Sequence, residues 1–293
     1  MSTTALPDLP CYLNGEFSSV RDAKVSVLDR GFIFGDGIYE VVPVYAGRPF
    51  RLAEHLARLG RSLGALRIAN PMADGEWRAL VDRLIAESAA RAGGTAGDLL
   101  IYIQVTRGVA VRDHLFPKDV QPTVFAMASR MNPVSPADRA QGVACITAED
   151  FRWKMAHVKS ISLAGSVLAR QMGADAGAME TLMFRDGFLS EGAAVNAWVV
   201  KDGKVAGSPR DNLVLEGIRY GLMEELCREQ GIPFALRRIP QAEVLAADEV
   251  LISSATKEIL AVTRIDGQPV GNGRPGPIYE KLYAGYQRAK SAA

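Results

Sequence analysis

Cysteine is scarce in this sequence, and its scarcity excludes two common ways of stabilising a fold. The 293 residues include three cysteines, Cys11, Cys145 and Cys227. They lie far apart, their number is odd, and none stands at the short spacing typical of a metal-binding pair. We therefore expect neither a disulfide framework nor a structural zinc site, and no metal is predicted.

Long runs of one residue class are also missing. Lys plus Arg total 34 and Asp plus Glu 33, a formal net charge of +1, without long runs of one sign. This balance argues against nucleic acid or an acidic membrane surface as the main partner, although local arginine clusters can still hold a small anion. No apolar stretch reaches the roughly 18 residues of a membrane span, and residues 1–10 lack the pattern of a secretory signal. We expect a cytoplasmic protein.

The composition that is present is typical of a soluble globular protein, with 48% apolar and 23% charged residues. The length favours two domains over one. Residues 131–138, M-N-P-V-S-P-A-D, hold two prolines among polar neighbours and indicate a boundary. We predict a smaller N-terminal α/β domain at 1–131, an interdomain linker at 132–137 and a larger C-terminal domain at 138–293.

Strand and helix patterns mix in both halves. Asn14-Gly15 is a strong hairpin signal, and β-rich runs alternate with leucines at helical spacing. The expected helices cover residues 54–66, 77–92, 163–172 and 215–230, and one more follows Pro277. The expected fold class is therefore α+β (mixed α/β).

Lys159 lies in H-V-K-S-I-S-L, at the edge of a mostly apolar segment and just before a predicted helix. The positive end of a helix dipole and an apolar surround both disfavour an ammonium. A neutral amine at this place could attack a carbonyl and form a Schiff base. From this segment alone, however, a lysine with a buried stem and a solvated head is the commoner interpretation.

Glu191 follows a predicted hairpin strand in L-S-E-G-A-A-V-N. A carboxylate here could pair with a protonated ring nitrogen, which pyridoxal phosphate needs in order to serve as an electron sink. A solvated glutamate at a turn is the alternative, and this segment alone favours it.

Arg112 and His114 stand two residues apart, so in extended backbone their side chains point to the same side. Arginine can hold a carboxylate through two parallel hydrogen bonds, and histidine can add a third donor. Arg107 is a weaker candidate for the same role. A solvated loop that carries an incidental Arg and His is the alternative.

Two segments and one arginine could bind a phosphate. Residues 215–219, L-E-G-I-R, open a predicted helix, where free amides and the dipole favour an anion. Residues 253–256, S-S-A-T, end a predicted strand and offer hydroxyls and amides, and Arg58 could supply the countercharge. Each signal is weak alone, since many helix starts and Ser/Thr turns look similar. We expect His55 and Trp153 to be structural.

Together these segments resemble the pyridoxal-phosphate aminotransferases of fold type IV, and among them most of all the D-amino-acid aminotransferases. The motifs are spread along the chain, and the resemblance covers nearly all of residues 11–290. In order, they are R-G-F-I-F-G-D-G-I-Y-E-V, E-H-L-A-R-L, Q-V-T-R-G-V-A-V-R-D-H-L-F-P, H-V-K-S-I-S-L-A-G-S-V-L-A, S-E-G-A-A-V-N and L-E-G-I-R. The resemblance implies a two-domain fold type IV enzyme, bound pyridoxal 5'-phosphate and a homodimer.

The resemblance also implies roles for single residues. Lys159 matches the catalytic lysine that carries the cofactor as a Schiff base and moves the substrate's proton. Tyr39, Arg112 and His114 match the trap for the substrate carboxylate, which in this family is completed across a dimer interface. The residues that match cofactor-binding positions are Arg58, Lys159, Glu191, Leu215, Gly217, Ile218, Arg219, Ser254 and Ala255.

The sequence departs from the family pattern at two places. Residues 193–195, A-A-V, stand where the D-amino-acid enzymes usually have a serine-rich run, so the pocket is expected to be more apolar. Ala255 replaces a usual threonine, with Thr256 beside it. These changes bear on substrate range and cofactor affinity more than on the type of reaction.

The implied reaction transfers the amino group of a D-amino acid, such as D-alanine, to a 2-oxo acid, such as 2-oxoglutarate, in a ping-pong mechanism. Three alternatives share the fold: a branched-chain L-amino-acid aminotransferase, an (R)-amine transaminase and an aminodeoxychorismate lyase. The Arg112/His114 pair argues against the first two. A non-enzymatic cofactor-binding protein is a further alternative, although it would not need every expected catalytic residue.

Overall fold

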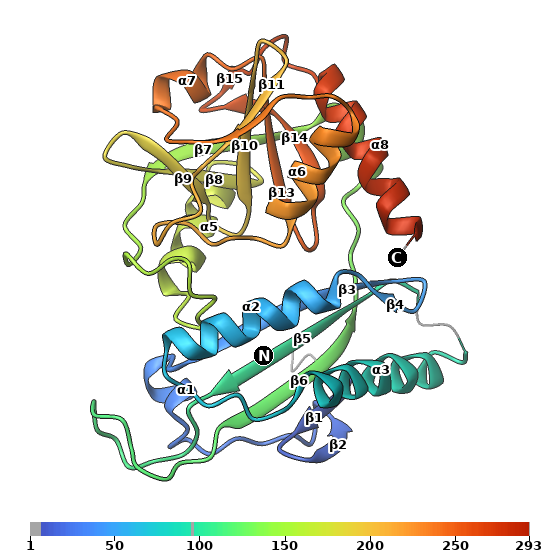
Figure 1. Ribbon diagram of the computed structural model, residues 1–293, viewed down its shortest axis with the longest axis vertical. Helices are drawn as coiled ribbons and strands as arrows, with labels where there is room; N and C mark the ends of the chain where they lie inside the picture. The colour runs from blue at the N-terminus through green and yellow to red at the C-terminus, as the bar shows by residue number, and fades with distance from the viewer. Residues whose placement is uncertain (1–6, 95–96, 293) are drawn as a thin grey trace. The chain divides into compact units, whose positions relative to one another are not determined.

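The chain folds into two compact units, seen in the computed structural model of Figure 1, which describes residues 7–94 and 97–292. The first unit comprises the residues up to Met131 together with Val158–Leu163, and the second comprises Asn132–His157 and Ala164–Ala292. The short segment Val158–Leu163 is the main difference from the predicted boundaries, which placed Lys159 in the C-terminal domain. The physical reason is a long-range contact, because Val158 is buried in the apolar core of the first unit.

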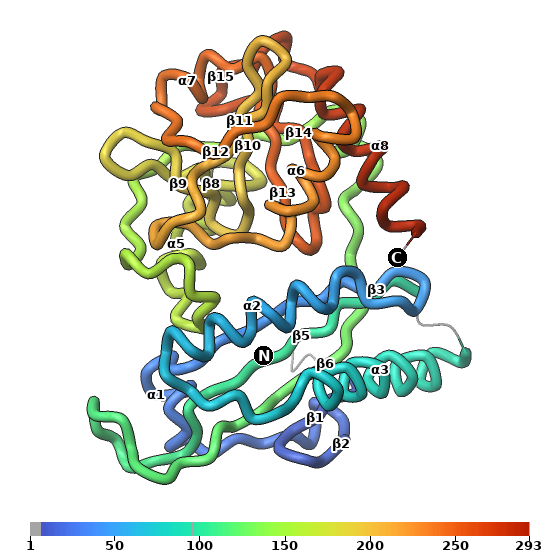
Figure 2. Tube along the Cα trace, viewed as in Figure 1, coloured from blue at the N-terminus to red at the C-terminus, as the bar shows by residue number. Residues whose placement is uncertain are grey.

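The first unit is built on one antiparallel sheet. Its strands are β1 (Pro10–Leu13), β2 (Glu16–Ser19), β3 (Gly37–Tyr45), β4 (Arg48–Pro49), β5 (Leu99–Thr106) and β6 (Thr123–Arg130). They are ordered β2-β1-β6-β5-β3-β4. Figure 2 shows β5 and β6 side by side, with the loop that joins them extending away from the sheet. This loop, residues 107–122, carries Arg112 and His114.

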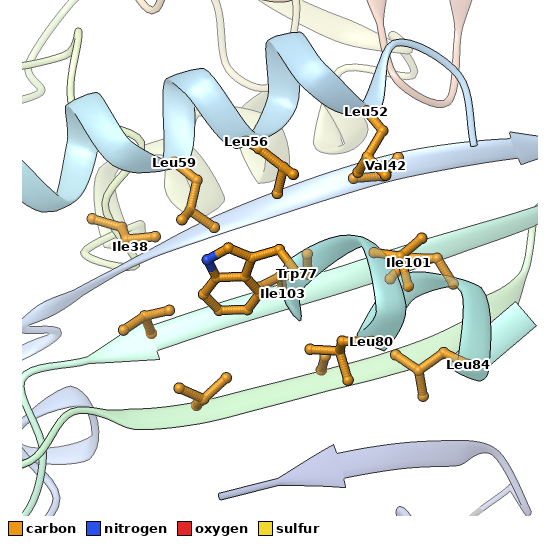
Figure 3. Packing of buried hydrophobic residues seen from close by; sticks show 14 of the residues in the cluster. Ile38, Val42, Leu52, Leu56, Leu59, Trp77, Leu80, Leu84, Ile101 and Ile103 are labelled. Carbon is orange, nitrogen blue, oxygen red and sulfur yellow. The ribbon is translucent and has the colours of Figure 1, made fainter. Parts of the chain in front are cut away.

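Helices α2 (Leu52–Ala65) and α3 (Asp74–Arg91) pack on one face of this sheet. The leucine stripe that predicts α2 points inward, and in Figure 3 Leu56 and Leu59 face the same cluster as Trp77 of α3. Burying each such side chain contributes about 1.5–3 kcal/mol relative to exposure. The predicted helices at 54–66 and 77–92 are therefore confirmed, each with a start two or three residues earlier.

The second unit contains a mixed sheet. Its strands are β7 (Val143–Glu149), β8 (Glu180–Arg185), β9 (Phe188–Gly192), β10 (Asn196–Lys201), β11 (Lys204–Gly207), β12 (Phe234–Leu236), β13 (Glu249–Ser254), β14 (Glu258–Ile265) and β15 (Gln268–Pro269). They are ordered β12-β11-β10-β13-β14-β7-β8-β9, with β15 beside β14. Strand β7 runs parallel to both β14 and β8, whereas most other pairs are antiparallel. Sheets and helices in both units confirm the expected α+β class.

The helices of the second unit are α4 (Pro136–Gln141), α5 (Ala164–Asp175), α6 (Arg219–Glu229), α7 (Gln241–Leu245) and α8 (Pro277–Ala292), and α1 (Arg30–Phe34) is a short helix of the first unit. Helix α4 occupies part of the predicted linker. Pro136 suits the first helical turn, and the Ser135 hydroxyl caps it by accepting from the Asp138 amide at 3.0 Å. In the described part of the chain, no helix combines the length and apolarity needed to cross a membrane.

Candidate active site

The segment that carries Lys159 runs along strand β3 like an added strand. The Tyr39 amide donates to the Lys159 carbonyl at 2.9 Å, and the Ile161 amide donates to the Gly37 carbonyl at 3.0 Å. The Lys159 amide in turn donates to the Ser62 hydroxyl of α2 at 3.2 Å. Backbone hydrogen bonds on both sides therefore fix where the Lys159 side chain starts.

Gly35 lets this segment approach closely. A Cβ atom added at Gly35 would lie 2.6 Å from the Ser162 hydroxyl, and the φ angle of +66° also disfavours other residues. The Gly35 carbonyl accepts a hydrogen bond from that hydroxyl at 3.0 Å. Gly35 in the motif R-G-F-I-F-G-D-G thus has a structural role, because it lets the segment that carries Lys159 pack closely.

The amine of Lys159 lies against an aromatic ring. Its Nζ atom is 4.1 Å from the centroid of the Tyr39 ring, and the side chain is half-buried. Among the described residues, no hydrogen bond or ion pair engages Nζ. Next to it, burial and the neighbouring Tyr39 raise the pKa of Tyr102 to about 12, and the Tyr102 hydroxyl donates to Gln104 at 2.7 Å. An amine that is not tied into an ion pair can serve as a nucleophile.

Arg58 is buried in a charged cluster near the lysine segment. Its Nε and Nη2 atoms donate to the two oxygens of Glu40 at 2.7 and 2.8 Å, and His55 contacts the same carboxylate at 2.7 Å. Burial raises the pKa of Glu40, but Arg58 and His55 outweigh it and hold that pKa well below its usual range. Ser62, which binds the Lys159 amide, lies one helical turn after Arg58 on α2. Sequence analysis did not find the role of Glu40.

Arg112 and His114 are brought together by one ring. The Arg112 Cζ atom lies 5.3 Å from the centroid of Phe34, and the His114 ring centroid lies 5.4 Å from it. Both side chains are exposed on the loop between β5 and β6. In the part of the chain that the structure describes, the Arg112 guanidinium has no carboxylate partner, so its fork of donors is available to an anion.

The Arg107 side chain binds other groups of the protein, although the sequence offers it as a second candidate for binding the substrate carboxylate. Its Nε and Nη2 atoms donate to Asp36 at 2.8 and 3.0 Å, and it also donates to two backbone carbonyls at 2.7 and 3.0 Å. The side chain is buried. Arg107 therefore has a structural role.

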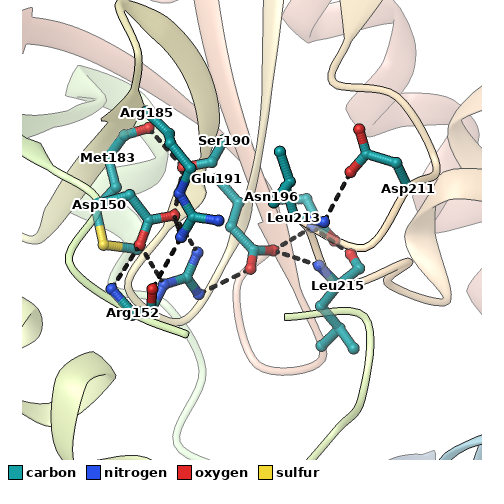
Figure 4. A network of polar contacts seen from close by, with 10 residues as sticks. All are labelled: Asp150, Arg152, Met183, Arg185, Ser190, Glu191, Asn196, Asp211, Leu213 and Leu215. Atoms are coloured by element: carbon teal, nitrogen blue, oxygen red, sulfur yellow. Dashed lines mark hydrogen bonds and ion pairs between the residues drawn. The ribbon is translucent and has the colours of Figure 1, made fainter. Parts of the chain in front are cut away.

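Glu191 lies at the end of β9 in the polar network of Figure 4. Its Oε1 atom accepts a hydrogen bond from Arg152 at 2.8 Å, and its Oε2 atom accepts from the Asn196 amide group at 3.0 Å and from the Leu215 backbone amide at 3.2 Å. Arg152 divides its donors between Glu191 and Asp150. Glu191 is therefore not the solvated turn residue that its segment alone suggests.

Burial dominates the electrostatics of this carboxylate. Desolvation raises the pKa of Glu191 from 4.5 to about 7, although Arg152 opposes the rise. A buried carboxylate in this state gains from a further positively charged N–H donor. The protonated nitrogen of a pyridine ring is such a donor, so the chemistry of this site fits pyridoxal phosphate.

The residues of L-E-G-I-R pack against the same asparagine. A Cβ atom added at Gly217 would lie 2.0 Å from Asn196 Oδ1, and the Asn196 side chain also donates to the Leu215 carbonyl at 2.9 Å. Ile218 is the N-cap of α6 and Arg219 its first residue. The Arg219 guanidinium donates to the Tyr286 hydroxyl at 2.7 Å, so an anion at this helix start would meet backbone amides.

Ser254 is the last residue of β13, and Ala255 follows it directly. Ser253 is the register partner of Asn196 across β13 and β10. The Ser254 hydroxyl accepts from the Lys257 amide at 3.1 Å and lies 3.4 Å from the Thr256 hydroxyl. The second unit thus gathers the candidate residues Glu191, Leu215 and Gly217 around Asn196, with Ser254 next to them.

Sequence analysis missed three members of this network, Asp150, Arg152 and Asn196. A signal existed for Asn196, which closes the quoted motif S-E-G-A-A-V-N. No local pattern links Arg152 to Glu191, which stands 39 residues later.

Comparisons with known proteins show the family of the chain. The family model described as "Amino-transferase class IV" matches residues 37–265. D-alanine aminotransferases of Staphylococcus epidermidis and Bacillus licheniformis are 37% and 35% identical to the chain, over 94% of its length and 96% and 95% of theirs. The structure of a branched-chain amino acid aminotransferase from "T.th." with pyridoxamine 5'-phosphate is 25% identical, with a TM-score of 0.88, over 98% of this chain and 95% of that one. The expected fold type is confirmed, and the chain belongs to the class IV aminotransferase family.

Proposed function

We propose that this protein is a D-amino-acid transaminase that uses pyridoxal 5'-phosphate. D-alanine is the proposed donor and 2-oxoglutarate the proposed acceptor. The names of the relatives at 35–37% identity support this choice of donor. The observation that carries it is the pair Arg112 and His114 on the Phe34 ring, with the Arg112 guanidinium available to a carboxylate.

The cofactor would be held by residues of several elements. Lys159 is the proposed covalent attachment point, because its amine is half-buried and free of ion pairs among the described residues. Glu191 is the proposed partner of the ring nitrogen, because it is a buried carboxylate that lacks a full set of cationic donors. Leu215 is proposed to pack on the ring. The proposed phosphate ligands are Arg58, the start of α6 at Gly217, Ile218 and Arg219, and the turn at Ser254 and Ala255.

When bound, the cofactor supplies an electron sink for the charge left on the substrate when its α-proton is removed. Glu191 would keep that sink effective by accepting a hydrogen bond from the protonated ring nitrogen, which would stay protonated. The free amine of Lys159 would take the α-proton as a general base and later return a proton as an acid. These two side chains are thus proposed to divide the work between proton transfer and charge stabilisation.

The substrate carboxylate is proposed to lie against Arg112 and His114, with Tyr39 at its side. Two parallel N–H donors from arginine match the two carboxylate oxygens, and the histidine ring adds one more. An amine without a carboxylate would gain nothing from this pair. The residues 193–195 contribute Ala193 and Val195 as buried apolar side chains, consistent with a more apolar pocket.

Other features of the assembly stay predictions. We propose that each compact unit is a domain, that two copies of the chain form a homodimer, and that the protein works in the cytoplasm. Size-exclusion chromatography with light scattering tests the dimer directly, since a mass of about one chain would overturn it.

Half-reaction spectroscopy tests the proposed substrate class. The cofactor-loaded protein is mixed with D-alanine, L-leucine or (R)-1-phenylethylamine, and conversion of the bound cofactor to its pyridoxamine form is followed by absorbance. We expect D-alanine to react fastest. The branched-chain alternative, favoured by likeness of fold to such enzymes, predicts that L-leucine reacts fastest.

A further inference from the structure

The ring of Phe34 is the meeting point of three polar side chains. Besides Arg112 and His114, it contacts Arg30, whose Cζ atom lies 4.8 Å from the ring centroid. Phe34 is the last residue of α1, whose start is capped by the Asp29 side chain accepting from the Gly31 amide at 2.8 Å. The Phe34 ring therefore belongs to a short helix whose N-terminus is capped.

An ion cluster of two buried arginines around the partly buried Asp36 holds the loop that carries Arg112 and His114. Asp36 accepts hydrogen bonds from Arg30 Nε and from Arg107 Nε, both at 2.8 Å. Arg30 then donates through Nη1 to the Asp113 carbonyl at 2.5 Å, and the Arg107 guanidinium lies 3.7 Å from the centroid of Phe116. The two arginines thus tie the loop down on either side of His114.

Apart from these contacts, little apolar packing orders the loop of residues 107–122. Val111 is 83% exposed and Leu115 76% exposed. Without ring and ion contacts, Arg112 and His114 would have to be ordered by the substrate itself, and that ordering would weaken binding. Each cation–ring contact is expected to change affinity by a few-fold.

We propose that Phe34 is a positioning residue for substrate recognition: its ring presets Arg112 and His114 toward one carboxylate, while the Arg30–Asp36–Arg107 cluster holds the loop that carries them. This inference rests on the proposed function for its kinetic consequence. Its structural content, the fixed orientation of His114, does not depend on which substrate the enzyme takes.

The kinetic test compares three variants of the cofactor-loaded enzyme with the wild type. Phe34→Leu removes the ring, Phe34→Tyr keeps it, and Phe32→Leu is a matched control on the same helix, since Phe32 is 72% exposed and makes no ring contact among the described residues. We expect Phe34→Leu to raise KM for D-alanine about tenfold with kcat nearly unchanged, as loss of two ring contacts implies. Phe34→Tyr and Phe32→Leu should match the wild type. An unchanged KM in Phe34→Leu would overturn the proposal.

The structural test uses NMR of the histidine rings. The chain has three histidines, His55, His114 and His157, so a His114→Asn spectrum assigns the His114 signals. The Phe34 ring current should displace those signals in the wild type and in Phe34→Tyr, and Phe34→Leu should move them toward the values of an exposed histidine. Phe34→Met serves as the ring-free variant if Phe34→Leu does not fold. Unmoved His114 signals in the ring-free variant would refute the positioning role, whereas a wild type inert to D-alanine would count against the proposed function alone.

Discussion

Glu191 and Arg152 form a buried ion pair, in which the carboxylate Oε1 atom accepts a hydrogen bond from the guanidinium at 2.8 Å. Arg152 also binds Asp150 through two other nitrogens, so only one of its nitrogens serves Glu191. Burial therefore prevails and the pKa of Glu191 rises to about 7. The network fixes the position of the Glu191 carboxylate but gives it only one cationic donor.

Glu191→Gln should change the pH dependence of stability in the cofactor-free protein. A folded-state pKa raised from 4.5 to about 7 means that the stability from the protonated form is fully present below pH 4.5 and is lost as the pH rises through 7. The wild type should therefore lose about 3 kcal/mol relative to Glu191→Gln over this window, and nothing further above it. Urea unfolding at a series of pH values measures the difference. A constant offset between the two proteins at every pH would show that Glu191 has an ordinary pKa.

Gly217→Ala should weaken both the fold and cofactor binding. The new Cβ would lie 2.0 Å from Asn196 Oδ1, so Asn196 must move, and with it the hydrogen bonds to Glu191 and Leu215. We expect a loss of about 1–3 kcal/mol in the free energy of unfolding and a higher dissociation constant for pyridoxal phosphate. Gly221→Ala is the matched control, since it lies in α6 with open space around its Cβ and should be neutral or slightly stabilising. Equal behaviour of the two variants would contradict the close approach at Gly217.

Arg112 and Arg107 should respond differently to the same substitution. Arg112→Met should leave stability nearly unchanged, because the side chain is exposed, and should cut kcat/KM for D-alanine by about 100-fold through loss of a bidentate carboxylate contact. Arg107→Met removes one of the two arginine partners of the partly buried Asp36 and two hydrogen bonds to backbone carbonyls, so it should lower the free energy of unfolding by about 1–3 kcal/mol. Thermal melts and steady-state kinetics on both variants check the contrast. A destabilised Arg112→Met would place that residue in the scaffold instead.

The sequence predicted the elements whose cause is local. The leucines of α2 repeat at helical spacing, so both the helix and its buried face could be expected. Long-range pairs could not be predicted in this way. Asp36 and Arg107 stand 71 residues apart, and no periodicity links them. The segment around Lys159 joins the first unit because of hydrogen bonds to β3, which lies more than 110 residues earlier in the chain.

The candidate site also combines features that local sequence could predict with features that depend on long-range contacts. Local chemistry allowed Glu191 to be a partner for a ring nitrogen but favoured a solvated side chain, and the resemblance to a family favoured the partner. The structure adds a physical reason, because Arg152, Asn196 and the Leu215 amide enclose the carboxylate. The prolines near residue 135 carried a second message, since Pro136 also starts the short helix α4 within the predicted linker.

The chirality of the product tests the account most directly. The enzyme is incubated with D-alanine, 2-oxoglutarate and pyridoxal phosphate, and the glutamate formed is resolved by chiral chromatography alongside a pyruvate assay. We predict equal amounts of pyruvate and D-glutamate from the wild type, and none above background from Lys159→Ala. Formation of L-glutamate, or an undiminished yield from Lys159→Ala, would contradict the account.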